Sequence, residues 1–262
     1  MKWTADDSIQ CKANCTALGY LTDPYNRFFA HSSAKRPPII NRGYWARVNR
    51  VWLTLTRFVE RAGSGAQVIS LGAGFDTSFW QLKDRFPQAD FTYTEMDFPD
   101  VCSRKAAIIA KHPELAVGTL ATAHTGEIVS ERYRLVGGDL RNVESTLERL
   151  RQINKSEAPT FVLAECVLVY LAPEHSDALI AALAAAFPNV ALLTYDVINP
   201  NDAFGREMTA NLQARGIAMR GVQQYPSLQS HESRLHRYFP RYEVRHMLDI
   251  YNTLTDQAER RR

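Results

Sequence analysis

The sequence predicts an α/β fold in which helices cover a parallel sheet, and three observations support this prediction. Short apolar runs alternate with longer segments of helical periodicity through the middle of the chain. A two-glycine turn, Gly72-Ala-Gly74, joins the first apolar run to a helix. Acidic residues follow several of the later runs. Such alternation is typical of parallel sheets with right-handed crossovers.

Length and composition fit one domain, because 262 residues that are 45% hydrophobic can bury a sizeable core. A net charge of +3 gives no basic stripe for nucleic acid, and no apolar run approaches the roughly 20 residues of a membrane span. The N-terminus lacks the apolar core of a signal peptide. Four cysteines without a CxxC pair favour free thiols in a reducing compartment over a metal site. We expect a cytoplasmic monomer without metal, membrane or nucleic acid.

Helical segments precede the glycine turn. Residues 7–30 begin as a polar-to-amphipathic helix and then break at turn-forming residues. Residues 44–60 have apolar side chains at helical spacing, and Gly63-Ser-Gly65 ends that helix. We assign residues 1–62 to an N-terminal helical lid.

Strands and helices then alternate. Strands are predicted to end near residue 69 and to cover 91–97, 133–136, 160–164 and 190–195. The helices between them are predicted from Thr77 and over 101–111, 143–153 and 173–187, the last with proline at its first position. The predicted parts are an α/β core at 63–198, an inserted helical substrate lid at 199–235, and a C-terminal part at 236–262 with a sixth strand at 242–247.

The glycine turn predicts a nucleotide-type pocket, because it brings backbone N–H groups close to a ligand at a helix N-terminus. A dinucleotide fingerprint requires a third glycine, and the chain has Thr77 at that position. This difference argues against a pyrophosphate. An oxidoreductase that uses a nicotinamide dinucleotide stays an alternative, which titration with NADH would test.

Four predicted strands end at notable residues, Gly72, Asp97, Asp139 and Glu165, at the edge where ligands of an open α/β sheet bind. Asp97 lies about 20 residues after the turn, at the distance suited to ribose hydroxyls, and Glu95 competes for that role. Asp139 and Leu140 suit the amino group and the ring of an adenine. Glu165 interrupts an apolar run and needs a buried partner, either a cationic ligand or a lysine or arginine of a lid. Together they indicate a nucleoside with a positive centre, S-adenosylmethionine.

Each of these positions also has a purely structural interpretation. Gly72 and Gly74 suit an ordinary strand-to-helix turn, Asp97 suits a helix N-cap, and Asp139 suits a turn.

Motifs extend over nearly the whole chain, and the two most specific are Asn41-Arg-Gly-Tyr44, within the matching stretch 40–48, and Ala164-Glu-Cys-Val-Leu-Val-Tyr170. A third, Leu71-Gly-Ala-Gly-Phe-Asp-Thr-Ser-Phe-Trp80, contains the glycine turn, which alone is less specific. Further matching segments are Cys11-Lys12, Gly19-Tyr20, Asp23-Pro-Tyr25, Met96-Asp-Phe-Pro99 and Gly138-Asp-Leu-Arg141. In these motifs the chain resembles the leucine carboxyl methyltransferases, which act on the C-terminal leucine of the protein phosphatase 2A catalytic subunit. The resemblance implies a class I, Rossmann-like methyltransferase fold, S-adenosyl-L-methionine as cofactor, and the phosphatase tail as partner.

The residues that the resemblance assigns to the cofactor are Lys12, Arg47, Gly72, Asp97, Asp139, Leu140 and Glu165. Lys12 and Arg47 match positions near the methionine carboxylate, and Glu165 matches a contact after the fourth strand. Tyr170 and the lid at 199–235 are our candidates for the wall on the peptide side. No catalytic residue is named, because a C-terminal carboxylate with a pKa of about 3.5 is already ionised at neutral pH and needs no general base.

The chain departs from the family pattern at its C-terminus, where residues 251–262 contain no apolar run for the usual last strand. We therefore expect the final strand to be missing, which would leave strand edges bare. A catalytically silent binding module is an alternative on this ground. A related branch that carboxymethylates a modified tRNA base, in a wybutosine-type reaction, is another. That branch usually carries an added repeat domain, for which we expect no room here.

Overall fold

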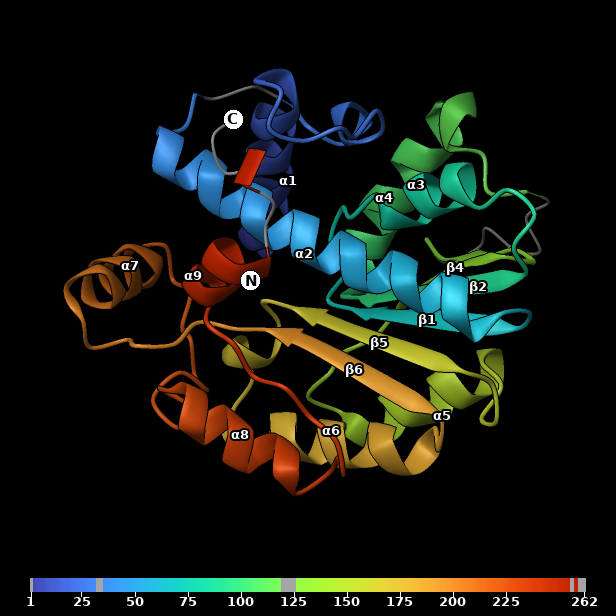
Figure 1. Ribbon diagram of the computed structural model, residues 1–262. Helices are drawn as coiled ribbons and strands as arrows, with labels where there is room; N and C mark the ends of the chain where they lie inside the picture. The colour runs from blue at the N-terminus through green and yellow to red at the C-terminus, as the bar shows by residue number, and fades with distance from the viewer. Residues whose placement is uncertain (1, 32–34, 119–125, 255–256, 259–262) are drawn as a thin grey trace.

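The computed structural model describes residues 2–31, 35–118, 126–254 and 257–258, and shows a six-stranded sheet between two layers of helices (Figure 1). The strands are β1 (Ala66–Leu71), β2 (Phe91–Asp97), β3 (Ile128–Val129), β4 (Tyr133–Gly137), β5 (Thr160–Glu165) and β6 (Val190–Tyr195). Their order is β3-β4-β2-β1-β5-β6, and only β3 and β4 pair antiparallel. The predicted α/β fold is confirmed, and β3 is an addition to it.

The strand order places a crevice at the carboxyl ends of β1 and β5. The chain runs from β1 outward to β2 and β4, then crosses to β5 on the other side of β1. Val68 of β1 is in register with Tyr93 of β2 and with Phe161 of β5. In open α/β sheets, ligands bind where the strand order reverses in this way. The glycine turn follows β1 directly and therefore lies at this point.

Helices cover both faces of the sheet (Figure 1). On one face lie α2 (Pro38–Ala62), α3 (Ser78–Arg85) and α4 (Pro99–Lys111), with α1 (Lys2–Ala17) beside α2. On the other lie α5 (Val143–Ile153) and α6 (Pro173–Ala186), followed along the chain by α7 (Ala203–Ala214) and α8 (Leu228–His236). Short helical turns are η1 (Asn26–Phe28), η2 (Pro113–Leu115) and η3 (Leu168–Tyr170). None of the helices in the described ranges is long and apolar enough to cross a membrane.

Local sequence explains where these helices begin. Prolines stand in the first turn of α2, α4 and α6, where the missing N–H costs nothing. Asn142 caps α5, because its side chain accepts a hydrogen bond from the Ser145 N–H. These signals explain why the predicted range 143–153 agrees with the observed helix.

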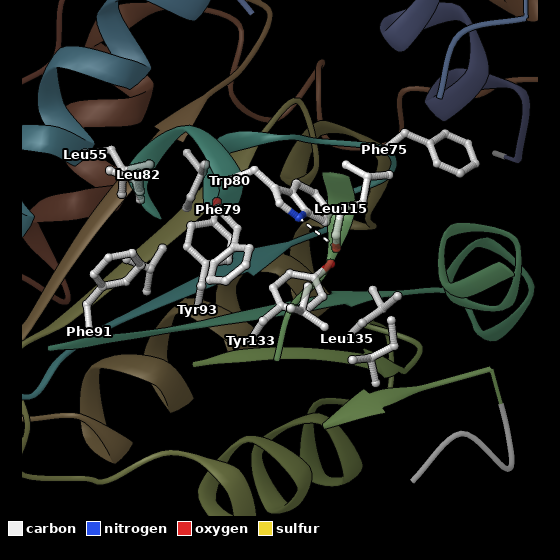
Figure 2. Close-up of a cluster of buried hydrophobic side chains, with 14 of the residues drawn as sticks. Leu55, Phe75, Phe79, Trp80, Leu82, Phe91, Tyr93, Leu115, Tyr133 and Leu135 are labelled. Carbon is white, nitrogen blue, oxygen red and sulfur yellow. Dashed lines mark hydrogen bonds between the residues drawn. The ribbon is translucent and has the colours of Figure 1, made fainter. Parts of the chain in front are cut away.

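An aromatic cluster anchors α3 on the sheet, and with it the glycine turn that precedes α3. Figure 2 shows Phe79 and Trp80 of this helix packed against Tyr93 and Tyr133 of the strands. The ring centroids of Phe79 and Tyr133 lie 4.7 Å apart. The Trp80 indole N–H donates to the Leu115 carbonyl at 3.1 Å (Figure 2). Aromatic contacts of this kind add about 0.5–1.5 kcal/mol each beyond the burial of their area.

The predicted sixth strand at 242–247 is wrong. Residues 242–246 have no regular structure, and α9 (Met247–Asp249) and a π-helical turn, η4 (Ile250–Leu254), follow. Tyr242 and Val244 alternate with polar residues as in a strand, but Glu243 and Arg245 pair with each other in solvent instead of joining an edge. A strand needs a pairing edge as well as a suitable pattern.

Within the described residues β6 is the last strand, which agrees with the expected lack of a final strand. All six residues of β6 are at least partly exposed, whereas β1 is wholly buried. Residues 255–256 and 259–262, to which the expectation also referred, lie outside the described ranges. The division into lids and core stays a prediction.

Candidate functional site

A cavity of about 950 Å³ opens at the carboxyl ends of the central strands. Side chains from α1, α2 and α7 form the walls opposite the sheet. The sequence candidates on its wall are Lys12, Arg47, Gly72, Asp97, Asp139, Leu140, Glu165 and Tyr170. The structure therefore brings all of these residues to one cavity, while their contacts with a ligand stay predictions.

The backbone N–H groups of Gly72 and Gly74 in the glycine turn are hydrogen-bonded to acceptors of the protein itself. Gly72 and Gly74 have φ angles of +59° and +55°, which favour glycine, and a Cβ at Gly72 would lie 2.7 Å from Val167 Cγ2. The Gly72 N–H donates to the Met96 carbonyl and the Gly74 N–H to Asp97 Oδ2, both at 2.7 Å. These N–H groups are not free to bind a pyrophosphate. The geometry agrees with the missing third glycine.

Asp97, and not Glu95, is the carboxylate that reaches the cavity. Asp97 Oδ1 accepts from the Phe98 N–H at 2.7 Å, and each oxygen keeps a lone pair for a further donor. Burial raises the pKa of Asp97 above its ordinary value, although these N–H bonds oppose the shift. Glu95 is fully buried on β2 and pairs with Lys105. Of the two ribose candidates, only Asp97 lies on the cavity wall, and its contact with a ribose stays a prediction.

Lys12, Arg47, Asp76 and Glu165 form a four-charge cluster beside the turn. Lys12 Nζ lies 3.1 Å from Asp76 Oδ1 and 3.6 Å from Glu165 Oε2. Arg47 Nε donates to Glu165 Oε1. Glu165 therefore has two cationic partners within the N-terminal helices. Its burial does not require a cationic ligand, which was one of the two alternatives left open by the sequence.

Burial and pairing oppose each other in the pKa values of the four-charge cluster. Burial alone would raise the pKa of Glu165, but Arg47 and Lys12 lower it below its ordinary value. Burial likewise acts against the ionised form of Asp76, but Lys12 and Lys105 bring its pKa down to about 2. Burial disfavours the Lys12 ammonium, yet its two carboxylate partners raise its pKa overall. The cluster is therefore fully charged at neutral pH and offers two cations and two anions.

Asp139, Leu140 and Tyr170 occupy other parts of the wall. Arg141 Nε donates to both oxygens of Asp139, at 2.9 and 3.0 Å, and these bonds lower the pKa of that carboxyl. Leu140 is 8% exposed and presents an apolar surface. Burial raises the pKa of Tyr170 to about 12, so its side chain is a neutral phenol.

Sequence reasoning missed Asp76 as a site residue. Its Oδ2 accepts from the Ser78 N–H at 3.0 Å, which is the local bonding of a residue before a helix. The position of Asp76 directly after the glycine turn was the available signal. Its partner Lys12 lies 64 residues away in the chain, so the pair itself was not visible.

The two helices of segment 199–235 differ in their relation to the cavity. From α7, Phe204, Met208 and Leu212 line the wall, and Phe204 is 70% exposed at the rim. In contrast, α8 is bound to α6, where Arg234 Nε donates to Asp177 Oδ1 at 2.8 Å. Of these two helices, only α7 therefore contributes to the wall of the cavity, together with Arg215, Ile217 and Met219 from the segment after it.

Comparisons with known proteins show similarity to one methyltransferase family. The family model described as leucine carboxyl methyltransferase matches residues 6–184. The chain is 35% identical to the leucine carboxyl methyltransferase 1 homolog of Arabidopsis thaliana, covering 99% of this chain and 80% of that protein. It is 36% identical to leucine carboxyl methyltransferase 1 of Bos taurus, covering 90% and 73%.

Two further comparisons are with a wybutosine-synthesizing protein and with a solved methyltransferase structure. The chain is 35% identical to the human tRNA wybutosine-synthesizing protein 4, covering 99% of this chain but 40% of that protein. A crystal structure from Thermobifida fusca YX, described as a methyltransferase, has a TM-score of 0.52 at 19% identity. It covers 79% of this chain and 72% of that one, and supports the class I, Rossmann-like methyltransferase fold.

Proposed function

This chain belongs to the leucine carboxyl methyltransferase family, and we propose that it methylates the C-terminal leucine carboxylate of the protein phosphatase 2A catalytic subunit, using S-adenosyl-L-methionine. The observation that carries the proposal is the four-charge cluster beside the glycine turn. It offers charges of both signs in the crevice where this fold class binds its ligands.

The residues present fit this cofactor. S-adenosylmethionine supplies a methyl group on a positively charged sulfur. Its amino-acid end carries one carboxylate and one ammonium. The cations Lys12 and Arg47 suit the carboxylate, and the anions Asp76 and Glu165 suit the ammonium. Asp97 has acceptor capacity for ribose hydroxyls.

The proposed reaction needs no general base from the protein. A C-terminal carboxylate has a pKa of about 3.5 and is ionised at neutral pH. What the chain supplies is alignment, which can lower a barrier by roughly 7–11 kcal/mol, together with exclusion of water. Transfer removes one positive and one negative charge, so a water-poor cavity favours it. The apolar wall from Leu140 and from Met208 and Leu212 of α7 suits this requirement.

We assign Arg47 to the cofactor and not to the acceptor. Besides its bond to Glu165, its guanidinium carbon lies 5.0 Å from the Tyr195 ring centroid and 5.5 Å from that of Tyr44. An arginine bound to the acceptor carboxylate would withdraw charge from the attacking oxygen and slow the transfer.

Removing Arg47 tests this assignment. Arg47→Ala should weaken S-adenosylmethionine binding at least tenfold, because losing a charged hydrogen bond costs about 1.5–3 kcal/mol. Isothermal titration calorimetry measures the affinity, and Arg57→Ala, on the exposed side of the same helix, is the matched control. Equal cofactor affinity in Arg47→Ala and wild type would contradict the assignment.

The acceptor is tested with labelled cofactor and the purified phosphatase catalytic subunit, intact and without its terminal leucine. We expect label on the intact subunit alone. Label on both forms would refute methylation of the terminal carboxylate.

A second candidate function follows from the 35% identity to the human wybutosine-synthesizing protein. Under this alternative the acceptor is a carboxyl group on a modified tRNA base. Incubating the chain and labelled cofactor with total tRNA separates the two, since our proposal predicts no label on tRNA. A nicotinamide dinucleotide is disfavoured by the closed glycine turn, and titration with NADH should give no binding heat.

A further inference from the structure

A fully buried ion pair lies directly behind the glycine turn. Lys105 of α4 donates to Glu95 of β2, and both side chains are 0% exposed. Neither residue lines the cavity. A buried ion pair contributes little net stability, because desolvation of the two charges offsets their attraction, and apolar residues of similar size often serve as well. Stability alone is therefore a weak reason for this pair.

The Lys105 ammonium also reaches the turn itself. Its Nζ donates to the main-chain carbonyl of Asp76 at 2.6 Å. The aromatic rings of Phe29 and Trp80 stand 5.7 and 5.6 Å from the same nitrogen. Lysine has three donors, and two of them join β2 to the end of the turn. The rings confine the ammonium between the N-terminal segment and α3.

Asp76 connects Lys105 to the four-charge cluster, because its main-chain carbonyl accepts from Lys105 and its carboxylate belongs to the cluster. Its N–H donates to the Ala73 carbonyl at 3.0 Å, so its backbone closes the turn. Its carboxylate accepts from Lys12, which in turn lies 3.6 Å from Glu165. A shift of the Asp76 carbonyl would therefore move the carboxylate that orients Lys12.

We propose that Lys105 is a positioning residue for the cofactor, holding the Asp76 end of the glycine turn, and that Glu95 anchors the Lys105 side chain there through their direct contact. This inference rests on the proposed binding of S-adenosylmethionine in the cavity. It assigns a role in cofactor affinity to two residues that do not line the cavity.

Two variants separate positioning from stability. Lys105→Met leaves Glu95 buried without its partner and should lower both the melting temperature and the cofactor affinity. Lys105→Met combined with Glu95→Met removes both charges and should melt close to wild type. The Asp76 carbonyl still lacks its donor in the double variant. Its affinity should therefore stay about tenfold below wild type, the size expected for one charged hydrogen bond.

The measurements are the melting temperature without ligand and the dissociation constant for S-adenosylhomocysteine by calorimetry, at a temperature where every variant is folded. Arg234→Met, which breaks the partly buried pair of Arg234 with Asp177 away from the cavity, controls for loss of stability and should keep wild-type affinity. In methyl transfer, the double variant should raise KM for S-adenosylmethionine and keep kcat.

A double variant with wild-type melting and wild-type affinity would overturn the proposal, as would equal losses of affinity in Arg234→Met and in the double variant. Absence of binding to the wild-type chain would instead count against the proposed function. The two failures are therefore distinguishable.

Discussion

Replacing Asp76 by asparagine removes one anion from the four-charge cluster and keeps the shape of the side chain. The asparagine oxygen can still accept from the Ser78 N–H, so the change tests the charge facing Lys12. The folded pKa of Asp76 is about 2, against an ordinary value of 3.8. At about 1.4 kcal/mol for each pH unit, this difference corresponds to about 2 kcal/mol of stability at pH 7.

The pH dependence has a definite sign. Because folding depresses the pKa of Asp76, its contribution is complete above pH 3.8 and is lost as the pH falls through about 2. Urea unfolding of wild type and Asp76→Asn should therefore differ by about 2 kcal/mol at pH 7 and by roughly half of that at pH 3. A difference that is equal at the two pH values, or absent at pH 7, would refute the argument.

Two other substitutions test the surroundings of the turn. Gly72→Ala places a Cβ 2.7 Å from Val167 in a left-handed conformation and should cost about 1–3 kcal/mol in urea unfolding. Gly43→Ala, where an added Cβ has open space, is the control and should not destabilise; equal losses would contradict the steric argument. Trp80→Phe removes the hydrogen bond to the Leu115 carbonyl and should cost about 1 kcal/mol in the same assay. An unchanged unfolding midpoint would show that this bond contributes nothing.

Local signals made much of the fold predictable. The strands at 91–97 and 190–195 agree with the observed bounds because their apolar runs end at clear turn or cap residues. The same kind of signal failed at 242–247, since alternation cannot show whether a neighbouring edge accepts a strand. The two-residue strand β3 has no pattern long enough to detect.

Individual residues of the site could be predicted from the sequence, but the ion pairs between them could not. Acidic residues at strand ends were informative because the carboxyl ends of parallel strands meet at one edge. The partners of Glu165 could not be predicted, because Arg47 lies 118 residues away in sequence and the fold alone brings the two together. For the same reason the pattern that predicts a helix over 101–111 does not indicate that Lys105 contacts Glu95 and Asp76.

Whether the methyl group is transferred to a carboxylate is tested by the alkali lability of the bond that holds it. After reaction with cofactor labelled in its methyl group, the phosphatase catalytic subunit is treated with mild alkali and the volatile label is counted. A methyl ester on the terminal carboxylate hydrolyses to labelled methanol, so we expect volatile label that is lost when the terminal leucine is absent. Label that stays on the protein after alkali would show methylation at nitrogen or sulfur, and would contradict carboxyl methylation.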